Sequence, residues 1–490
     1  MNEIGLVEGQ VYPSSVVRQA GSTYFLVRLH EDGSRRLGIL GPAASFSGSP
    51  ASDGQITLCR LDAGNAAALR DRLPWLKPVP LGCRPSFGFG DRMGSATPGH
   101  IQALRSADPQ GRQAPIFAQQ SVRENSRTGR TPQQVVDDAM WGVFQEGWRR
   151  DWGADADHLK ELSDLEAFAA AGYTFFTIDP GDHVDNAAQS DSPGELQKKV
   201  ATLPWDQLQT SYRDTQARYC THPFALEGLT LTFDEATLQR ALAKVGRALA
   251  LAITFAHGLA ERLAGQAFDF EVSVDETDTP TSVHEHFLIA AELTRCGIPF
   301  VSLAPRFVGK FQKGVDYIGA LAVFERELER HAAVMRHFGN YRLSVHTGSD
   351  KFAIYPALAR ATHGLIHVKT AGTSYLEALR VVAVASPALF RQIVELARDR
   401  FETDRQSYFL DASLDRLPET GQRSDRDLPA FLDHFDSRQI LHVTFGSVLA
   451  KFGPQIAQVL ADNEAEHRAG LESHFARHLA PFVREDDPIE

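Results

Sequence analysis

The chain has 490 residues, more than one average domain, although a single barrel with insertions reaches about 300 to 400 residues. Hydrophobic residues make up 43% and charged residues 23% of the chain, an ordinary globular composition that excludes extensive disorder. The net charge of -12 argues against nucleic acid or an anionic membrane as a partner, because both favour clustered Lys and Arg. A small polar substrate fits this charge.

The N-terminal region is predicted to be a small α+β domain over residues 1–82. Two short strands, at residues 22–29 and 36–40, flank a loop with the Asp-Gly sequence typical of a hairpin. Residues 66–76 follow with a helical pattern. A proline-rich stretch then ends the region, and the pattern of the chain changes.

The central region, residues 83–452, repeats an apolar strand followed by a helix, and we count eight such units. Alternating strands and helices predict a parallel sheet, and eight units predict closure into a (β/α)8 TIM barrel. A doubly wound sheet is the alternative, but its glycine-rich fingerprint is weak here. The expected strands are residues 86–90, 115–118, 173–178, 268–274, 300–304, 341–345, 364–366 and 439–445.

Two connections are long, residues 121–172 after the second expected strand and residues 184–267 after the third. Such insertions usually cover the carboxyl ends of barrel strands, where barrel enzymes hold their active sites. Residues 453–490 are expected to form a helical extension. It packs either outside the barrel or against a second copy, so a homo-oligomer stays open.

Cysteine usage and the N-terminus bear on location. The four cysteines form no C-x-x-C pair, which indicates neither a zinc ribbon nor a disulfide framework. Residues 1–5 lack a basic segment followed by an apolar run, and no stretch approaches about 18 consecutive apolar residues. We therefore expect a cytoplasmic protein that is neither exported nor inserted in a membrane.

Three expected strand ends carry histidines, namely His183, His346 and His367. A barrel brings its strand ends to one pocket, and three protein ligands leave positions open for substrate or water. The sequence therefore predicts a divalent metal ion, of the group Zn, Mn, Ni, Co or Fe, held by these three. Each histidine alone is also explained as a hydrogen-bonding residue, whereas their convergence favours the metal. The pair His284 and His286 is set aside, because positions i and i+2 of a helix point apart.

Acidic side chains at the same strand ends supply candidates for proton transfer. Carboxylates in a partly dehydrated pocket exchange protons near neutral pH. Asp182 and Glu276 are the predicted acid/base pair. A capping or supporting role is an equal alternative for Glu276, and Asp275 beside it is an alternative for the second acid/base.

Basic and polar residues at the rim are candidates for binding the substrate. A substrate carboxylate needs one or two cations, for which Arg306, Lys351 and Lys369 are predicted, with Asp91 and Gln120 as further polar contacts. Residues 370–374 lead from a strand into a helix, where many barrels bind phosphate through backbone N–H groups. A phosphorylated sugar therefore stays open as a substrate.

Several long motifs resemble the tagaturonate epimerase family: residues 87–94, 96–100, 274–277 and 344–351. The resemblance extends over the whole chain. It implies a divalent metal ion and the interconversion of D-tagaturonate and D-fructuronate, and related enzymes accept fructose and tagatose. By position it carries over Asp182 and Glu276 as acid/base groups and His183, His346 and His367 as metal ligands.

The chemistry of this pair of sugars constrains the mechanism. The inverted carbon lies β to the ketone, so simple enolisation does not labilise its hydrogen. A retro-aldol route, in which the C–C bond beside that carbon breaks and re-forms, is the expected mechanism. Transient oxidation by a nicotinamide is the alternative, for which the fingerprint is missing. Two other classes stay open, a metal-dependent phosphosugar aldolase or isomerase and a non-catalytic sugar-binding protein.

Overall fold

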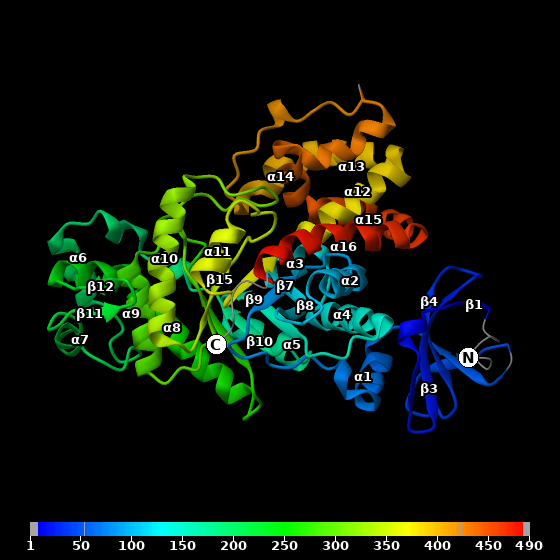
Figure 1. Ribbon diagram of the computed structural model, residues 1–490, viewed down its shortest axis with the longest axis horizontal. Helices are drawn as coiled ribbons and strands as arrows, with labels where there is room; N and C mark the ends of the chain where they lie inside the picture. Colours follow the sequence, from blue (N-terminus) through cyan, green and yellow to red (C-terminus); the bar gives the residue numbers. More distant parts are fainter. Residues whose placement is uncertain (1–7, 53, 422, 484–490) are drawn as a thin grey trace.

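The computed structural model describes residues 8–52, 54–421 and 423–483. Figure 1 shows a small antiparallel sheet at one end of the molecule, a barrel in the middle and a layer of helices above the barrel. The long insertion that contains α6, α7 and α8 lies on the side opposite to the small sheet. The barrel is thus the element that all other parts contact.

The N-terminal sheet confirms the predicted α+β cap. Its strands are antiparallel in the order β1-β3-β4-β6-β5, and β3 (Ser22–Leu29) pairs with β1, β2 and β4. Phe25 and Val27 fill one small core, while the alternate residues Tyr24 and Leu26 face the main core. This alternation is the expected result of a strand whose two faces are both covered. The other elements are β1 (Gly9–Val11), β2 (Val17–Gln19), β4 (Arg35–Leu40), β5 (Gly48–Pro50), β6 (Ile56–Cys59) and α1 (Ala63–Arg72).

Eight parallel strands close into a barrel in the order β10-β13-β14-β15-β16-β7-β8-β9, which confirms the predicted fold class. The strands are β7 (Ser86–Phe89), β8 (Ala114–Ser121), β9 (Gly153–Leu159), β10 (Phe175–Ile178), β13 (Asp269–Ser273), β14 (Ser302–Ala304), β15 (Arg342–Val345) and β16 (Ile366–Thr370). The helices between them are α2 (Thr97–Ala107), α3 (Val122–Thr128), α4 (Pro132–Glu146), α5 (Leu162–Ala170), α9 (Val283–Arg295), α10 (Leu321–Phe338) and α11 (Tyr355–Ala361).

Two expected strand positions need correction. The third strand is β9, within the expected connection 121–172, and its sequence GADADHL has no apolar run because its acids point into a polar barrel interior. The segment 439–445, expected as the eighth strand, lies instead in the buried helices α14 (Phe435–Val443) and α15 (Phe445–Asp462). A short, fully buried apolar segment has no periodicity that separates a helix from a strand. The long connection 184–267 therefore follows the fourth strand, not the third.

That connection runs from β10 to β13 and forms the outermost part of the molecule. It contains α6 (Pro193–Ala201), α7 (Tyr212–Tyr219), the hairpin β11 (Phe224–Leu226) and β12 (Leu229–Leu231), and α8 (Glu235–Arg262). Helix α8 is long and apolar enough to cross a membrane by length and composition alone, but 72% of its most apolar window is buried inside the protein. It packs against α6 and α9, as a core helix does.

The residues after β16 form a separate helical layer with its own apolar core. Helices α12 (Thr373–Ala385), α13 (Pro387–Asp404), α14 and α15 enclose side chains such as Leu379, Phe390 and Phe445. The last helix, α16 (Glu464–Leu479), returns to the barrel and packs on α2. The apolar face of the C-terminal extension is therefore covered by the same chain.

Candidate active site

The interior of the barrel is polar on one side. Inward positions alternate along a strand, which directs Asp155 and Asp157 of β9, Glu271 of β13 and Lys369 of β16 toward one another. The Lys369 Nζ lies 2.8 Å from Asp155 Oδ2, 2.8 Å from Asp157 Oδ1 and 2.9 Å from Glu271 Oε1. It also donates to Thr177 Oγ1 at 2.7 Å. Three buried carboxylates thus share one ammonium group.

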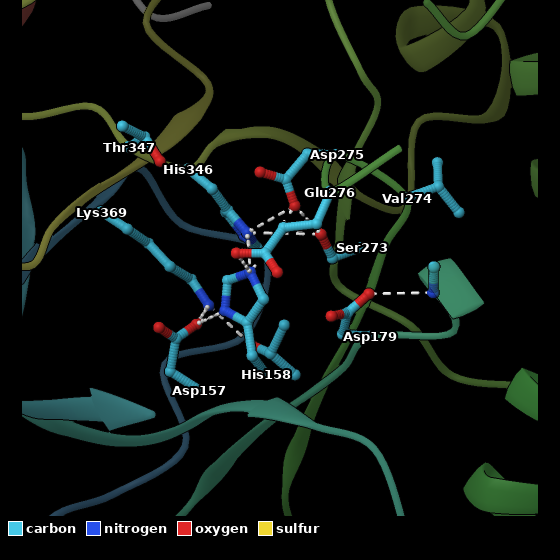
Figure 2. Close-up of polar contacts among 12 residues, drawn as sticks. Asp157, His158, Asp179, Ser273, Val274, Asp275, Glu276, His346, Thr347 and Lys369 are labelled. Carbon is cyan, nitrogen blue, oxygen red and sulfur yellow. Dashed lines mark hydrogen bonds and ion pairs between the residues drawn. The ribbon is translucent and has the colours of Figure 1, made fainter. Parts of the chain in front are cut away.

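Figure 2 shows the ring of His158 beside Asp157 and the Lys369 ammonium, with His346 next to it. His158 lies at the end of β9, and His346 directly follows β15. His158 Nδ1 donates to Asp157 Oδ1 at 2.8 Å, and His346 Nε2 donates to Glu271 Oε1 at 2.7 Å. These bonds assign the tautomers, because the nitrogen that donates to a carboxylate carries the hydrogen. The other two nitrogens, His158 Nε2 and His346 Nδ1, lie 3.3 Å apart, and each offers a lone pair when its imidazole is neutral.

The backbone of β9 explains how His158 reaches the site beside Asp157. Adjacent residues of a regular strand point to opposite faces. The pairing of β9 with β10 shifts register between Ala156 and Leu159, so that two residues of β9 oppose one residue of β10. His158 has φ of +54°, in the left-handed region, as the residue of a β-bulge. The bulge turns both side chains toward the mouth of the barrel.

Asp275, two residues beyond the end of β13, completes a group of three donors. Its Oδ1 lies 3.6 Å from His158 Nε2 and 3.2 Å from His346 Nδ1. Two ligands of one cation, each about 2.1 Å from it, lie about 3.0 to 3.4 Å apart. Two of the three separations fall in this range, and the third, 3.6 Å, is slightly longer. Nitrogen and carboxylate donors together suit Zn, Mn, Fe, Co or Ni.

A second observation supports a cation at this position. His158, Asp179 and Glu276 also offer ligand atoms within 4.8 Å of one another. Asp179 Oδ2 is buried and finds no hydrogen-bond partner within the described part of the chain; the nearest cation is Lys160, at 3.7 Å. A buried carboxylate oxygen without a partner is costly unless a cation lies near it. The residues present therefore fit a divalent metal ion.

The charges of the site shift the pKa values of its members. Burial alone would raise the pKa of Glu271, but Lys369 and His346 hold it well below its usual range. Burial would lower the pKa of His346, yet Asp275 raises it. In the same way Asp157 raises the pKa of His158 well above its usual value against the effect of burial. The carboxylates outnumber the cations, so the site attracts positive charge.

Two residues predicted from the sequence, Asp182 and His183, lie outside this group. Both belong to the short 3-10 turn Gly181–His183 after β10 and are exposed. The Asp182 carboxylate binds Lys160 at 2.8 Å, and its side chain is 74% exposed. Such a carboxylate stays hydrated, because a turn on the surface provides no dehydrated pocket.

His367 lies deeper in the barrel than the predicted metal position. Its Nδ1 is 2.7 Å from Ser86 Oγ, and burial lowers its pKa well below the usual value. Among the described residues, no group of three potential ligands within 4.8 Å includes His183 or His367. The structure brings His346 together with His158 instead, because strand register decides which residue stands at the open end.

The other predicted binding residues already hold protein groups. Lys351 is fully buried and donates to the carbonyl oxygens of Gln312, Val315 and Ser349, so it joins two loops. Burial lowers its pKa to about 7. Lys369 is equally enclosed, by the carboxylates described above. Neither ammonium is free to contact a substrate.

Asp91 and Gln120 support a loop rather than the pocket. Asp91 accepts hydrogen bonds from the backbone N–H groups of Met93, Gly94 and Ala96. Gln120 donates to the carbonyl oxygen of Asp91 at 3.0 Å. Both side chains are buried, and their hydrogen bonds shape the segment that follows β7.

A cavity of about 430 Å³ opens from His346 toward solvent. Its floor includes Asp275, Glu276 and His346, and the segment that follows α13 forms its outer wall with Tyr408. Glu276 is about one third exposed, binds Arg123 at 3.0 Å and lies 3.9 Å from His158 Nε2. Burial would raise the pKa of Glu276, but His158 and Arg123 lower it, so this carboxylate is ionised.

Three cations line the cavity: Arg306, Lys310 and Lys313. Arg306 is half-buried and donates to the carbonyl oxygens of Thr277, Phe307 and Gly309. Lys313 donates to Thr347 Oγ1 at 2.7 Å, which is its one hydrogen-bond partner in the described part of the chain. Since an ammonium group carries three hydrogens, Lys313 has hydrogens available to a ligand.

The predicted phosphate position is closed. At Gly372, before the N-terminus of α12, a Cβ would overlap the His442 ring. Ser374 is also buried, and it donates to the carbonyl oxygen of Gly90 at 2.7 Å. His442 comes from the segment that was expected to be a strand. Its ring takes the space that a phosphate group needs.

Sequence reasoning missed His158, Asp157, Glu271 and Lys313. The signal for the first two is present, because Asp155-Ala-Asp157-His158 places two acids at strand spacing before a histidine. Glu271 stands two residues before Ser273 on the same face of a predicted strand. Lys313 lies in an irregular loop, for which the sequence offers no comparable signal.

Comparisons with known proteins agree over nearly the whole chain. A family model for tagaturonate epimerase matches residues 12–482. The tagaturonate/fructuronate epimerase of Thermotoga maritima is 42% identical over 477 residues, 96% of each chain. The crystal structure of fructuronate-tagaturonate epimerase UxaE from Cohnella laeviribosi with one glycerol has a TM-score of 0.91 at 36% identity and covers 98% of both chains. The native crystal structure of that enzyme matches with the same values. The chain belongs to the tagaturonate epimerase family and is an epimerase, an enzyme of the isomerase class.

Proposed function

We propose that this protein interconverts D-tagaturonate and D-fructuronate by a metal-assisted retro-aldol reaction in the barrel pocket. The observation that carries the proposal is the convergence of His158 Nε2, His346 Nδ1 and Asp275 Oδ1 at separations of 3.2 to 3.6 Å. Asp275 and His346 also line the cavity. The names of the relatives supply the substrates. The closed phosphate position speaks against a phosphosugar.

His158, His346 and Asp275 would hold the divalent cation, with Asp179 beside His158. When bound, the cation supplies Lewis-acid stabilisation of the negative charge that develops on the carbonyl oxygen. Asp157 and Glu271 hold the two imidazoles in the tautomers that direct lone pairs at this point. Carboxylates in that position also raise the basicity of ligand histidines.

Glu276 is the proposed base. It is ionised and lines the cavity, so it can accept the proton of the hydroxyl group on the inverting carbon. As that O–H bond breaks, the C–C bond to the α-carbon breaks as well. The inverting carbon becomes an aldehyde, and the bonding electrons pass to the carbonyl oxygen of the other fragment. The aldehyde turns its other face, the C–C bond re-forms, and Glu276 returns the proton.

Arg306 and Lys313 are the proposed partners of the substrate carboxylate. They line the same cavity as Glu276, and Lys313 has free hydrogens. An ammonium–carboxylate hydrogen bond strengthens in a partly enclosed cavity. Such a pair favours the uronates over the neutral ketoses, which have a hydroxymethyl group at the same end.

A cytoplasmic location is also proposed. All four cysteines are among the described residues and are free, and burial raises the pKa of Cys59 to about 11, which keeps it a thiol. Free thiols are typical of a reducing compartment.

The test is an epimerase assay of the purified protein with tagaturonate, before and after removal of divalent ions with a chelator. We expect fructuronate to form, activity to be lost with the chelator, and activity to return with one of the five candidate metals. In deuterated water the inverted carbon should carry no solvent deuterium, because its hydrogen never leaves it. Solvent deuterium at that carbon, or full activity without metal, would contradict the mechanism.

A further inference from the structure

Lys369 joins the two carboxylates that orient the proposed metal-binding histidines. Its Nζ lies 2.8 Å from Asp157 Oδ1 and 2.9 Å from Glu271 Oε1. These are the same two oxygens that accept hydrogens from His158 Nδ1 and His346 Nε2. Any displacement of this one ammonium therefore disturbs both histidines, although they come from different strands.

The ammonium itself is held in a fixed place. Its side chain is 2% exposed, and two further groups bind the Nζ, Asp155 at 2.8 Å and Thr177 at 2.7 Å. Thr177 in turn lies 3.1 Å from Asp155 Oδ1 and 3.2 Å from Glu271 Oε1. Burial alone would remove the charge, but the surrounding carboxylates raise the pKa of Lys369, so the group stays an ammonium. With four partners and no exposure, it cannot reach a substrate.

We propose that Lys369 is a positioning residue that fixes the tautomers and ring orientations of His158 and His346, and thereby sets the affinity and geometry of the metal site. The inference rests on the proposed function, because it takes the convergence of the two imidazoles as a metal site. Asp157 Oδ1 accepts one hydrogen from the lysine and one from His158, whereas Glu271 Oε1 accepts a hydrogen from His346 and forms an ion pair with the lysine. The position of the ammonium thereby determines which lone pair of each carboxylate oxygen accepts the imidazole hydrogen.

The sign of the effect separates this role from simple charge balance. Lys369 is a cation, and a nearby cation disfavours the binding of another. If Lys369 supplied charge alone, its removal would tighten metal binding. If it positions the two carboxylates, its removal weakens metal binding, because the imidazoles lose the acceptors that hold them.

The experiment compares Co²⁺ binding by the wild-type protein and Lys369→Met, using titration calorimetry for affinity and the visible absorption bands for geometry. We expect Kd for Co²⁺ to rise about 10- to 100-fold and the absorption bands to change. Lys244→Met is the matched control. It removes another buried lysine, one that binds Glu285 at 3.0 Å and the carbonyl oxygen of Pro280 at 2.8 Å and, among the described residues, none of the four groups that bind Lys369. Its Kd and spectrum should equal those of the wild type.

A second variant covers the case in which Lys369→Met does not fold. Thr177→Val has nearly the same shape, keeps the charge of Lys369 and removes the hydroxyl that holds Nζ. It should weaken Co²⁺ binding in the same direction, by about threefold, with a small change in the bands. Unchanged or tighter binding in either folded variant, with an unchanged spectrum, would overturn the positioning role. Wild-type protein that epimerised tagaturonate without binding Co²⁺ would instead overturn the metal site itself.

Discussion

Two clusters of histidine and aspartate lie in this molecule, and they differ in what their nitrogens contact. In the first, Asp157 and Glu271 accept hydrogens from His158 and His346, so the remaining nitrogen of each ring faces the other ring. The second consists of Asp350, His474 and His478, which are equally close together. Composition alone does not separate them.

In the second cluster, the carboxylate already binds a protein cation, and His478 already has hydrogen-bond partners. Arg438 binds Asp350, and His478 Nε2 accepts the backbone N–H of Asp350 at 3.0 Å. His478 Nδ1 faces the carbonyl oxygen of His474 at 3.0 Å. Both nitrogens of His478 are therefore in use. A ligand site requires imidazole nitrogens that the backbone does not already bind. Among the described residues, the first cluster meets that condition at His158 Nε2 and His346 Nδ1, and the second does not meet it at His478.

The largest effect on turnover is expected from a substitution in the first cluster. His346→Ala removes a proposed ligand, so turnover should fall at least about 1000-fold, because the cation is worth several kcal/mol to the reaction. Bound metal, measured by elemental analysis after gel filtration, should be lost from a folded protein. His474→Ala, in the second cluster, is the control and should keep its metal. Equal metal loss in both variants would remove the distinction.

The next largest effect is a loss of stability from a substitution in the second cluster. Asp350→Asn leaves the buried guanidinium of Arg438 without a charged partner, which costs about 3 to 5 kcal/mol of stability. Urea unfolding should show this loss, while Co²⁺ affinity of the folded protein stays the same. A variant with normal stability and weakened Co²⁺ binding would mean that the second cluster also serves the metal.

The comparison extends to the lysines beside each cluster. Lys351 donates its three hydrogens to carbonyl oxygens, whereas Lys313 has hydrogens available toward the cavity. Lys313→Met should raise KM for tagaturonate about 10- to 100-fold, because a hydrogen bond to a charged group is worth about 1.5 to 3 kcal/mol.

The neutral ketose tagatose and the variant Lys310→Met provide the controls for this measurement. Lys310 also lines the cavity but is exposed and bound to Asp411 at 2.8 Å, so its loss should matter little. If Lys313→Met changed KM equally for the acid and the neutral sugar, the proposal that Lys313 binds the substrate carboxylate would be wrong.

The smallest effect is a pH dependence of the second cluster. Burial lowers the pKa of His478 to about 3, so the folded protein holds it neutral. The unfolded chain takes up that proton below about pH 6.5, so this residue makes stability fall as the pH drops from 6.5 toward 3. His478→Gln keeps an acceptor and a donor but cannot titrate. Its unfolding free energy between pH 6.5 and 5 should depend on pH less steeply, by up to about 1.4 kcal/mol per unit. An unchanged slope would contradict a neutral, buried His478.

Much of the site could be predicted from the polar residues at the carboxyl ends of the expected strands. His346, Asp275 and Glu276 were predicted at the carboxyl ends of barrel strands, and the structure brings them to one cavity. His367 belongs to a strand that was also predicted, yet it lies below the site. The difference is a matter of register, which a strand's composition does not report. One or two residues along a strand move a side chain from the mouth to the interior.

The sequence by itself determined the alternation of strands and helices, and therefore the parallel barrel and the edge at which its polar side chains meet. It also carried the long motifs of the family. Only the tertiary structure decided that β9 is a barrel strand, since its acids are stable inside the barrel because Lys369, from a strand over 200 residues later, compensates them. It also decided the roles of the histidines, because the β-bulge at His158 and the carboxylates across the barrel determine which nitrogen keeps a lone pair. Those contacts join residues from different strands. The sequence around one strand does not show which residue of a distant strand will lie opposite it in the closed barrel.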